Sequence, residues 1–161
     1  MAHGEAVPGA SVPGNDDKKF DSDCNMVDKW RLVQTITLDP SVMAGANSDI
    51  LKSDVNYRFN VSGTWENRPG EDVDAEYSTP NDWSTYTDAP YGGFPGGLLD
   101  VQVDNNFVDW GAYATSHEYT QSYVGNNASV NFRVFDGVVD PIPGWYTDNV
   151  GSLTIMIYEM N

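Results

Sequence analysis

The stretch SVNFRVFDGVVDPIPGWYTDNVGSLTIMIY, residues 129–158, decides the fold of this chain. Apolar and polar residues alternate strictly in its first and last parts, which is the period-2 pattern of strands buried on one face. We expect residues 130–134 and 153–158 to be core strands that pair with each other as neighbours. The side chains predicted to face the core are Val130, Phe132, Val134, Leu153, Ile155 and Ile157.

The loop between these two segments concentrates oxygen-bearing side chains and contains no Lys or Arg. Its carboxylates and amide belong to Asp136, Asp140, Asp148 and Asn149. Carboxylates that lie close together repel one another unless water or a cation screens them. Calcium takes six to eight hard oxygen ligands in flexible geometry, so it suits such a loop. Two interpretations stay open, a solvated turn and a calcium site.

Strand patterns continue through the chain from Trp30 onwards. We expect further strands at residues 30–38, 57–62, 73–78, 99–103, 107–110 and 117–123, separated by Gly, Asn and Asp turns. Short strands at such intervals, without an amphipathic helix, predict an all-β fold, namely an antiparallel β-sandwich or jelly roll over residues 29–161. Its core is also expected to contain Trp30, Leu32, Phe59, Val61 and Val101.

Residues 1–28 differ from the rest of the chain. Two Val-Pro-Gly turns precede the charged run NDDKKFDSD, and the few apolar residues are too far apart to form a core. This composition predicts an extended N-terminal arm that does not support itself. The arm either contacts a partner protein or folds back on its own domain. In the first case the partner-binding residues are Val7, Val12, Phe20 and Met26.

The charge of the chain limits its partners. Its 24 acidic and 8 basic residues give a net charge of −16, which disfavours binding to nucleic acid or to an anionic membrane. A single cysteine excludes an internal disulfide, and two histidines are too few for a structural zinc cluster. The first residues lack a basic region followed by an apolar core, so we expect a protein made without a signal peptide.

A polar segment rich in aromatic residues follows the second expected strand. Aromatic rings pack on the apolar face of a sugar, while carboxylates and amides bind its hydroxyls. The same residue types suit a protein interface, or the packing of the loop itself. The segment is residues 73–97, and its aromatic residues are Tyr77, Trp83, Tyr86, Tyr91 and Phe94.

Several segments, taken in order, resemble bacterial calcium-dependent galactophilic lectins and related galactose-binding-like β-sandwich modules. The resemblance spans residues 30–161, and its most specific parts are DAEYS and FDG…YTDNVGSLT. It implies a calcium ion held by Asp136 and by the pair Asp148 and Asn149, with sugar hydroxyls completing the shell. Main-chain oxygens near Trp145 and after Trp65 are further implied ligands. The other matching segments are YRFNVSGTWENRPGEDV, FVDWG, HEYTQSYVG and VNFRV.

The chain also departs from the lectin pattern. A histidine that contacts the sugar in those lectins falls at Tyr77, and residues 138–143 are an insertion in the calcium loop. The resemblance therefore does not carry over a sugar specificity. The candidate carbohydrate-binding residues are Asp74, Glu76, Tyr77 and Trp145.

Nothing in the chain has the pattern of a catalytic motif. Glu76 with Asp74, or Asp104 with Asp109, could be drawn as an acid and base pair, but 24 acidic residues make chance pairs inevitable. There is no Gly-x-Ser-x-Gly elbow, phosphate-binding Gly loop or His-Glu-x-x-His. We expect a protein that is not an enzyme.

Two functions are consistent with these observations. The first is a structural, oligomeric subunit on the surface of a phage-like virion, namely a decoration, cement or tail protein whose β-sandwich also binds calcium and glycans. The alternative is a free calcium-dependent lectin. The arm favours the first, because an assembled subunit can lay extended residues across a neighbouring protein, whereas an independent lectin has no use for them.

Overall fold

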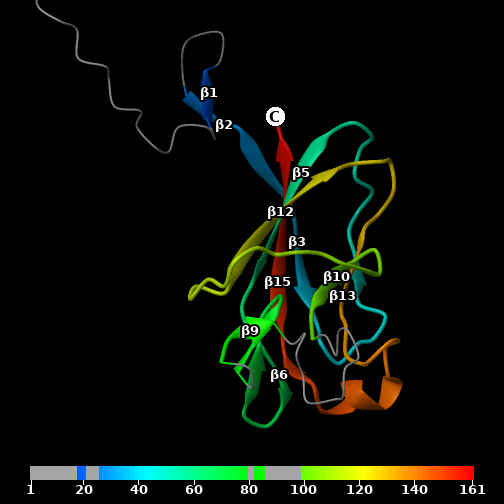
Figure 1. Cartoon of the computed structure of the whole chain (residues 1–161). Coiled ribbons are helices and arrows are strands. Elements are labelled where there is room, and N and C mark those ends of the chain that lie inside the picture. The colour runs from blue at the N-terminus through cyan, green and yellow to red at the C-terminus, as the bar shows by residue number, and fades with distance from the viewer. Residues whose placement is uncertain (1–17, 21–25, 80–81, 86–98) are drawn as a thin grey trace, which may run out of the picture.

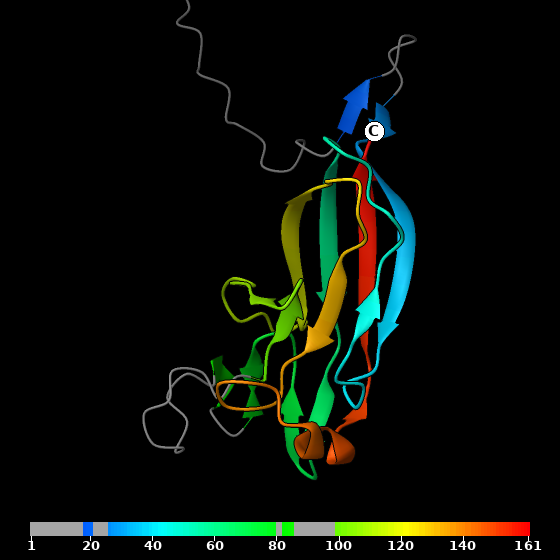
Figure 2. The same cartoon turned by 90° about the vertical axis from the view of Figure 1, so that its right-hand side faces the viewer.

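The structure is a computed structural model that describes residues 18–20, 26–79, 82–85 and 99–161. Two four-stranded antiparallel sheets pack face to face, with β10 and β13 to one side of the long strands β3, β15 and β5 (Figures 1 and 2). The predicted all-β antiparallel sandwich is confirmed. The first sheet has the order β12 (Glu118–Val124), β5 (Asn56–Ser62), β15 (Leu153–Met160), β3 (Trp30–Leu38). The second has the order β11 (Asn106–Phe107), β10 (Val101–Val103), β13 (Asn131–Val134), β4 (Ala46–Asn47).

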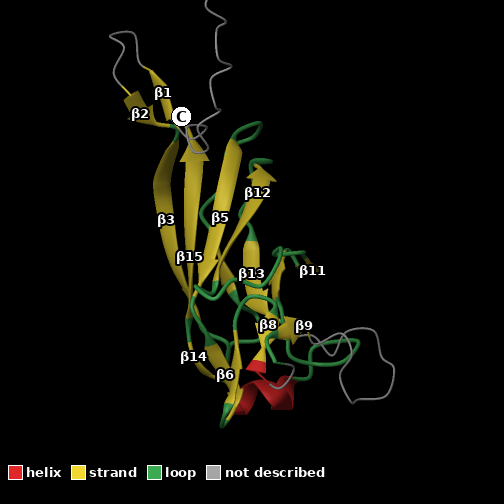
Figure 3. Cartoon of the chain, turned by 60° about the vertical axis from the view of Figure 1, so that its left-hand side comes forward, coloured by secondary structure: helices red, strands yellow, loops and turns green. Residues whose placement is uncertain are grey.

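A smaller five-stranded sheet and a short 3₁₀ helix extend the sandwich at the end away from the C-terminus (Figure 3). The order of this sheet is β14 (Val150–Gly151), β6 (Trp65–Arg68), β7 (Glu71–Val73), β8 (Tyr77–Ser78), β9 (Ser84–Thr85). The 3₁₀ helix η3 (Pro143–Asp148) begins with a proline, whose fixed φ suits a helix start. The sequence did not lead us to expect β6, β9, β14 or η3.

The core lies between the two large sheets. Phe59 and Val61 of β5 and Phe132 of β13 are at most 1% exposed, and Leu153, Ile155 and Ile157 of β15 are fully buried. Trp65 and Tyr146 close the core at the end that carries η3. The alternation in β5, β13 and β15 therefore identified the buried face correctly.

Two predictions about the strands are wrong. The segments 130–134 and 153–158 do not pair, because β13 pairs with β10 and β4 while β15 pairs with β5 and β3. They belong to opposite layers of the sandwich. Period-2 alternation indicates which face of a strand is buried, but it does not indicate the neighbouring strand.

The second error concerns Leu32 and Trp30, which are not in the core. Ile157 pairs with Gln34 but Tyr158 pairs with Leu32, so the register shifts at this point of β3. The bulge turns the residues before it onto the outer face, where Leu32 is 48% exposed. Trp30 is half-buried on that face, with the Arg58 guanidinium 4.3 Å from its ring centroid.

The N-terminal arm contains a hairpin that the sequence did not predict. β1 (Lys18–Phe20) pairs antiparallel with β2 (Met26–Asp28), and Phe20 lies opposite Met26. Val7 and Val12, the other predicted partner-binding residues, lie outside the described residues. Within the described part of the chain, no helix is both long enough and apolar enough to cross a membrane.

Candidate functional site

A cavity of about 380 Å³ lies at the η3 end of the sandwich. It is lined by the loop after β13, the helix η3, the tip of the β6–β7 hairpin and Leu99. The polar and aromatic side chains of the lining belong to Asn67, Arg68, Asp136, Trp145, Thr147 and Asp148. The structure thus brings Asp136, Asp148 and Trp145, which the sequence singled out, to one site.

The loop after β13 is held by the buried side chain of Tyr146. Its hydroxyl accepts a hydrogen bond from the Asp136 amide at 2.9 Å and donates one to the Val134 carbonyl at 2.9 Å. The Asp136 carbonyl accepts from the Ile142 amide at 2.9 Å. A Cβ at Gly137 would lie 2.2 Å from the Asp140 carbonyl oxygen, so only glycine fits there. These contacts fix the position of the Asp136 side chain.

Asp136 and Asn149 each carry a buried oxygen with no hydrogen-bond partner among the described residues. Asp136 is 2% exposed and Asn149 is 4% exposed, and the oxygens concerned are Oδ2 and Oδ1. The Asn149 amide nitrogen donates to the Pro40 carbonyl at 3.1 Å, which fixes the side chain. A buried polar atom without a partner costs about 1–3 kcal/mol, and a bound cation would remove that cost.

The charge state of Asp136 reflects its burial. Desolvation raises its pKa to about 6, hydrogen bonding from Asn149 opposes this shift, and the nearby Asp148 charge adds to it. Asp148 is exposed at the end of η3. Two carboxylates and an amide oxygen are hard donors of the kind that calcium prefers. The residues present therefore fit the cation that the sequence suggested.

This donor set is small. Within the described residues, no three His, Cys, Asp or Glu side chains lie together in an arrangement that could hold a metal ion. A calcium ion at Asp136, Asp148 and Asn149 would therefore need main-chain carbonyls, water or a ligand to reach six to eight oxygens. A protein that leaves several coordination positions to a ligand can bind that ligand through the metal.

The tip of the β6–β7 hairpin adds two side chains that the sequence did not predict, Asn67 and Arg68. Glu71 contacts both of them. Its Oε2 accepts from Asn67 Nδ2 at 3.1 Å, and its Oε1 pairs with Arg68.

The third sheet explains why this hairpin reaches the segment between β13 and β14. β14 pairs antiparallel with β6, with Val150 opposite Glu66 and Gly151 opposite Trp65. Because the two strands are antiparallel, the residues that follow Glu66 run beside the residues that precede Val150. Asn67 and Arg68 are therefore brought toward Asn149 and Asp148. A Cβ at Gly151, whose φ is +100°, would lie 3.3 Å from Trp65 Cα. A glycine therefore permits this close pairing.

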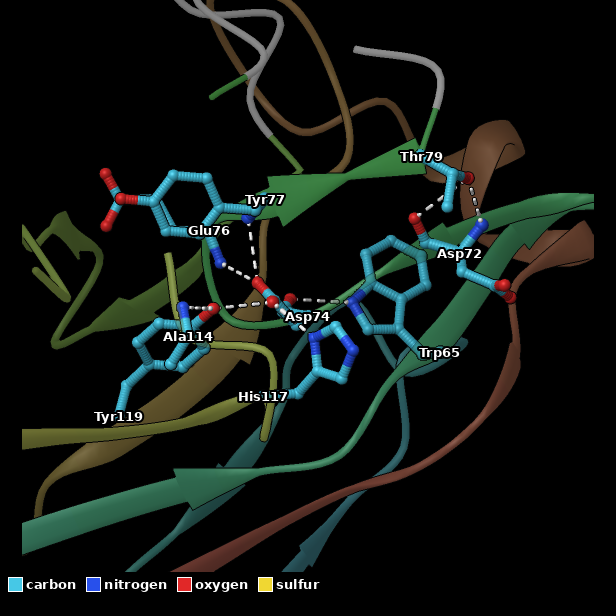
Figure 4. A network of polar contacts seen from close by, with 9 residues as sticks. All are labelled: Trp65, Asp72, Asp74, Glu76, Tyr77, Thr79, Ala114, His117 and Tyr119. Carbon is cyan, nitrogen blue, oxygen red and sulfur yellow. Dashed lines mark hydrogen bonds and ion pairs between the residues drawn. The ribbon is translucent and has the colours of Figure 1, made fainter. Parts of the chain in front are cut away.

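Asp74, Glu76 and Tyr77, the other predicted carbohydrate-binding residues, do not line the cavity. Asp74 is fully buried at the centre of a separate network (Figure 4). Its Oδ1 accepts from the amides of Glu76 and Tyr77 at 2.9 and 2.8 Å. Its Oδ2 accepts from the Tyr119 hydroxyl at 2.7 Å and lies 2.9 Å from His117 Nδ1. Four contacts saturate the carboxylate, so Asp74 holds the turn between β7 and β8.

Glu76 and Tyr77 also make internal contacts. Glu76 accepts from the Trp110 amide at 2.8 Å, and burial raises its pKa. The Tyr77 ring packs near Tyr113, which stacks on Trp83 with a centroid separation of 5.5 Å. A role for these residues in sugar binding stays a prediction. The structure favours packing as the use of this part of the aromatic segment, and residues 80–81 and 86–98 lie outside the described part.

Comparisons with known proteins identify no family for this chain. No family model matches the chain, and no curated protein matches it. One solved structure that is similar is described as "EclA N-terminal domain; PllA-like lectin". It is 15% identical to this chain, with a TM-score of 0.44, and the match covers 80% of this chain and 97% of the other. At this identity and score, the likeness bears on neither the ligand nor the site residues.

Proposed function

We propose that this domain is a carbohydrate-binding module without catalytic activity, and that calcium at Asp136, Asp148 and Asn149 takes part in binding the sugar. The observation that carries the proposal is the pair of buried oxygens, on Asp136 and Asn149, that lack partners among the described residues beside the cavity. When bound, the ion would supply a Lewis-acidic centre for sugar hydroxyls.

The protein's own side chains would orient the sugar. Trp145 lines the cavity and is 40% exposed, so its ring can pack against the apolar face of a pyranose. The Asn67 amide and the Thr147 hydroxyl can exchange hydrogen bonds with sugar hydroxyls. Together these groups form the combination of one apolar surface and a few polar atoms that small-ligand sites use.

The role in a virion-like assembly, with protein partners and oligomers, stays a prediction from the sequence. Its argument rests on the arm, of which Val7 and Val12 lie outside the described residues. Carbohydrate binding and assembly are compatible functions.

The decisive experiment measures calcium and sugar binding separately. Calcium should raise the melting temperature of the wild type and chelator should lower it, with a dissociation constant of about 10⁻⁴–10⁻³ M, as in extracellular modules. A panel of monosaccharides, titrated calorimetrically, should give binding heat only with calcium present.

Matched variants assign these effects to residues. Asp136→Asn should abolish the calcium response, whereas Asp140→Asn, the same change at an exposed position of the same loop, should preserve it. Trp145→Ala should keep the calcium response and weaken sugar binding. If neither calcium heat nor a melting shift occurs, the loop is a solvated turn and the proposal is wrong.

A further inference from the structure

The cavity contains one cationic side chain within its described lining, that of Arg68. The chain as a whole has only 8 basic residues against 24 acidic ones, so its long-range field repels anions. An arginine that lines a ligand cavity in such a protein provides a local site where an anionic group can be accommodated.

Glu71 holds Arg68 in position without occupying the cavity. The Glu71 side chain is 14% exposed, and each of its carboxylate oxygens contacts one residue of the hairpin tip, Asn67 or Arg68. Arg68 itself is 49% exposed. A guanidinium group has five N–H donors in a rigid fork, so it can serve a ligand carboxylate in addition to Glu71.

The opposite charges in the cavity have a consequence for binding. Asp136 and Asp148 would repel an anionic ligand, and a calcium ion bound between them would remove that repulsion. Arg68, which is paired with Glu71, then lies at a site whose two aspartate charges are neutralised, and its guanidinium N–H groups are the cationic donors of the described lining. Such a site distinguishes a sugar that carries a carboxylate from its neutral counterpart.

We propose that Arg68 forms a carboxylate subsite, and that the ligand of this cavity is an acidic saccharide of the uronic acid class. This inference rests on the proposed function, because it concerns the same site. Glu71 is a positioning residue, and Arg68 is the residue that contacts the ligand.

The test compares sugars that differ only at C6. Methyl galacturonoside and methyl galactoside, and the corresponding glucose pair, are titrated calorimetrically with calcium in excess. We expect the uronates to bind at least about tenfold more tightly than the neutral sugars, which corresponds to one charge-assisted contact. Salt should weaken uronate binding and leave neutral-sugar binding almost unchanged.

Variants test whether the preference for uronates comes from Arg68 itself or from the overall charge of the protein. Arg68→Gln should remove the uronate preference, and Arg68→Lys should restore part of it. Arg31→Gln is the matched control, because Arg31 is 59% exposed, pairs with Glu159 and lies outside this cavity. Glu71→Gln should reduce the preference by loosening the Arg68 side chain. The calcium melting shift verifies that each variant folds and retains the ion site.

The outcomes distinguish the two proposals. Equal binding of uronates and neutral sugars overturns the carboxylate subsite and leaves the proposed function intact. A loss in Arg31→Gln equal to that in Arg68→Gln also overturns it, because the effect would then be a general field. If no sugar of either kind binds, both proposals are wrong.

Discussion

The rings of Phe59 and Phe132 meet edge to face across the two layers of the sandwich, with centroids 5.0 Å apart and planes at 85°. Phe59 belongs to β5 and Phe132 to β13, so this contact joins the two large sheets. The edge of one aromatic ring is attracted to the face of another, which adds about 0.5–1.5 kcal/mol to the effect of burial.

Replacing Phe132 should therefore be among the most damaging changes in the chain. Phe132 is fully buried, so Phe132→Ala should lower the free energy of unfolding by about 3–5 kcal/mol, measured by urea denaturation. Phe107→Ala is a suitable control, because Phe107 is 44% exposed and should lose much less. A loss below about 1 kcal/mol in Phe132→Ala would contradict the observed packing.

The Asp74 network predicts a graded series of variants. Tyr119→Phe removes one hydrogen bond to a carboxylate and should cost about 1.5–3 kcal/mol of unfolding free energy. Asp74→Ala leaves the Tyr119 hydroxyl and two amides without their acceptor, so it should cost more. Thermal and urea unfolding measure both variants. Equal effects would show that Tyr119 is the only important partner of Asp74.

Asp100 should make the protein less stable as the pH rises. Burial, together with the charges of Glu76 and Asp74, raises its pKa to about 8 from a usual value of 3.8. The folded state therefore binds more protons than the unfolded state between these pH values. The contribution of Asp100 to the free energy of unfolding therefore falls as the pH rises from about 4 to about 8, and it is lowest above pH 8.

Asp100→Asn tests this linkage. The variant should be more stable than the wild type at about pH 8, with the difference shrinking toward about pH 4, as measured by urea denaturation across the range. Asp49→Asn, at an exposed position, should leave the pH profile unchanged. The prediction is wrong if both variants follow the wild-type profile.

Calcium binding should depend on the ionisation of Asp136. The metal binds the deprotonated carboxylate, and the pKa of Asp136 is raised to about 6 by burial. Calcium affinity should therefore fall as pH decreases through this value, approaching tenfold per pH unit below it. Titrations between about pH 5 and 8 measure the effect, and a constant affinity would exclude Asp136 as a ligand.

Removal of residues 1–28 should leave a folded domain. The hydrophobic core of the described residues begins at Ile36, and the apolar residues of the arm are too far apart in the sequence to form a core of their own. Circular dichroism and thermal unfolding of the truncated chain should match those of the full chain. If the arm binds a partner or a second copy, size-exclusion chromatography should show that the truncated chain no longer assembles. Identical assembly by both chains would reject that role.

Several properties of the fold followed from the sequence alone. The strict alternation in residues 57–61, 130–134 and 153–157 determined which side chains are buried, because successive side chains of a strand point to opposite faces. The composition of the loop after residue 134 singled out Asp136, Asp140, Asp148 and Asn149 as oxygen donors, and the resemblance to galactophilic lectins selected Asp136, Asp148 and Asn149 among them. The structure places Asp136 and Asp148 in the lining of the cavity, and Asn149 follows Asp148 in the chain.

Other properties were decided only by the tertiary structure. The bulge opposite Ile157 put Leu32 outside the core, although its local pattern matched the buried positions. The pairing of β14 with β6 brought Arg68 into the same cavity as Asp136 and Asp148, which come much later in the chain. Asp74, a predicted sugar-binding residue, is buried and accepts hydrogen bonds from its own domain. The orientation of a side chain toward one face is a local property of the backbone, so a short pattern can specify it. The neighbour of a strand and the register between two strands depend on contacts between residues distant in the chain, which alternation does not encode.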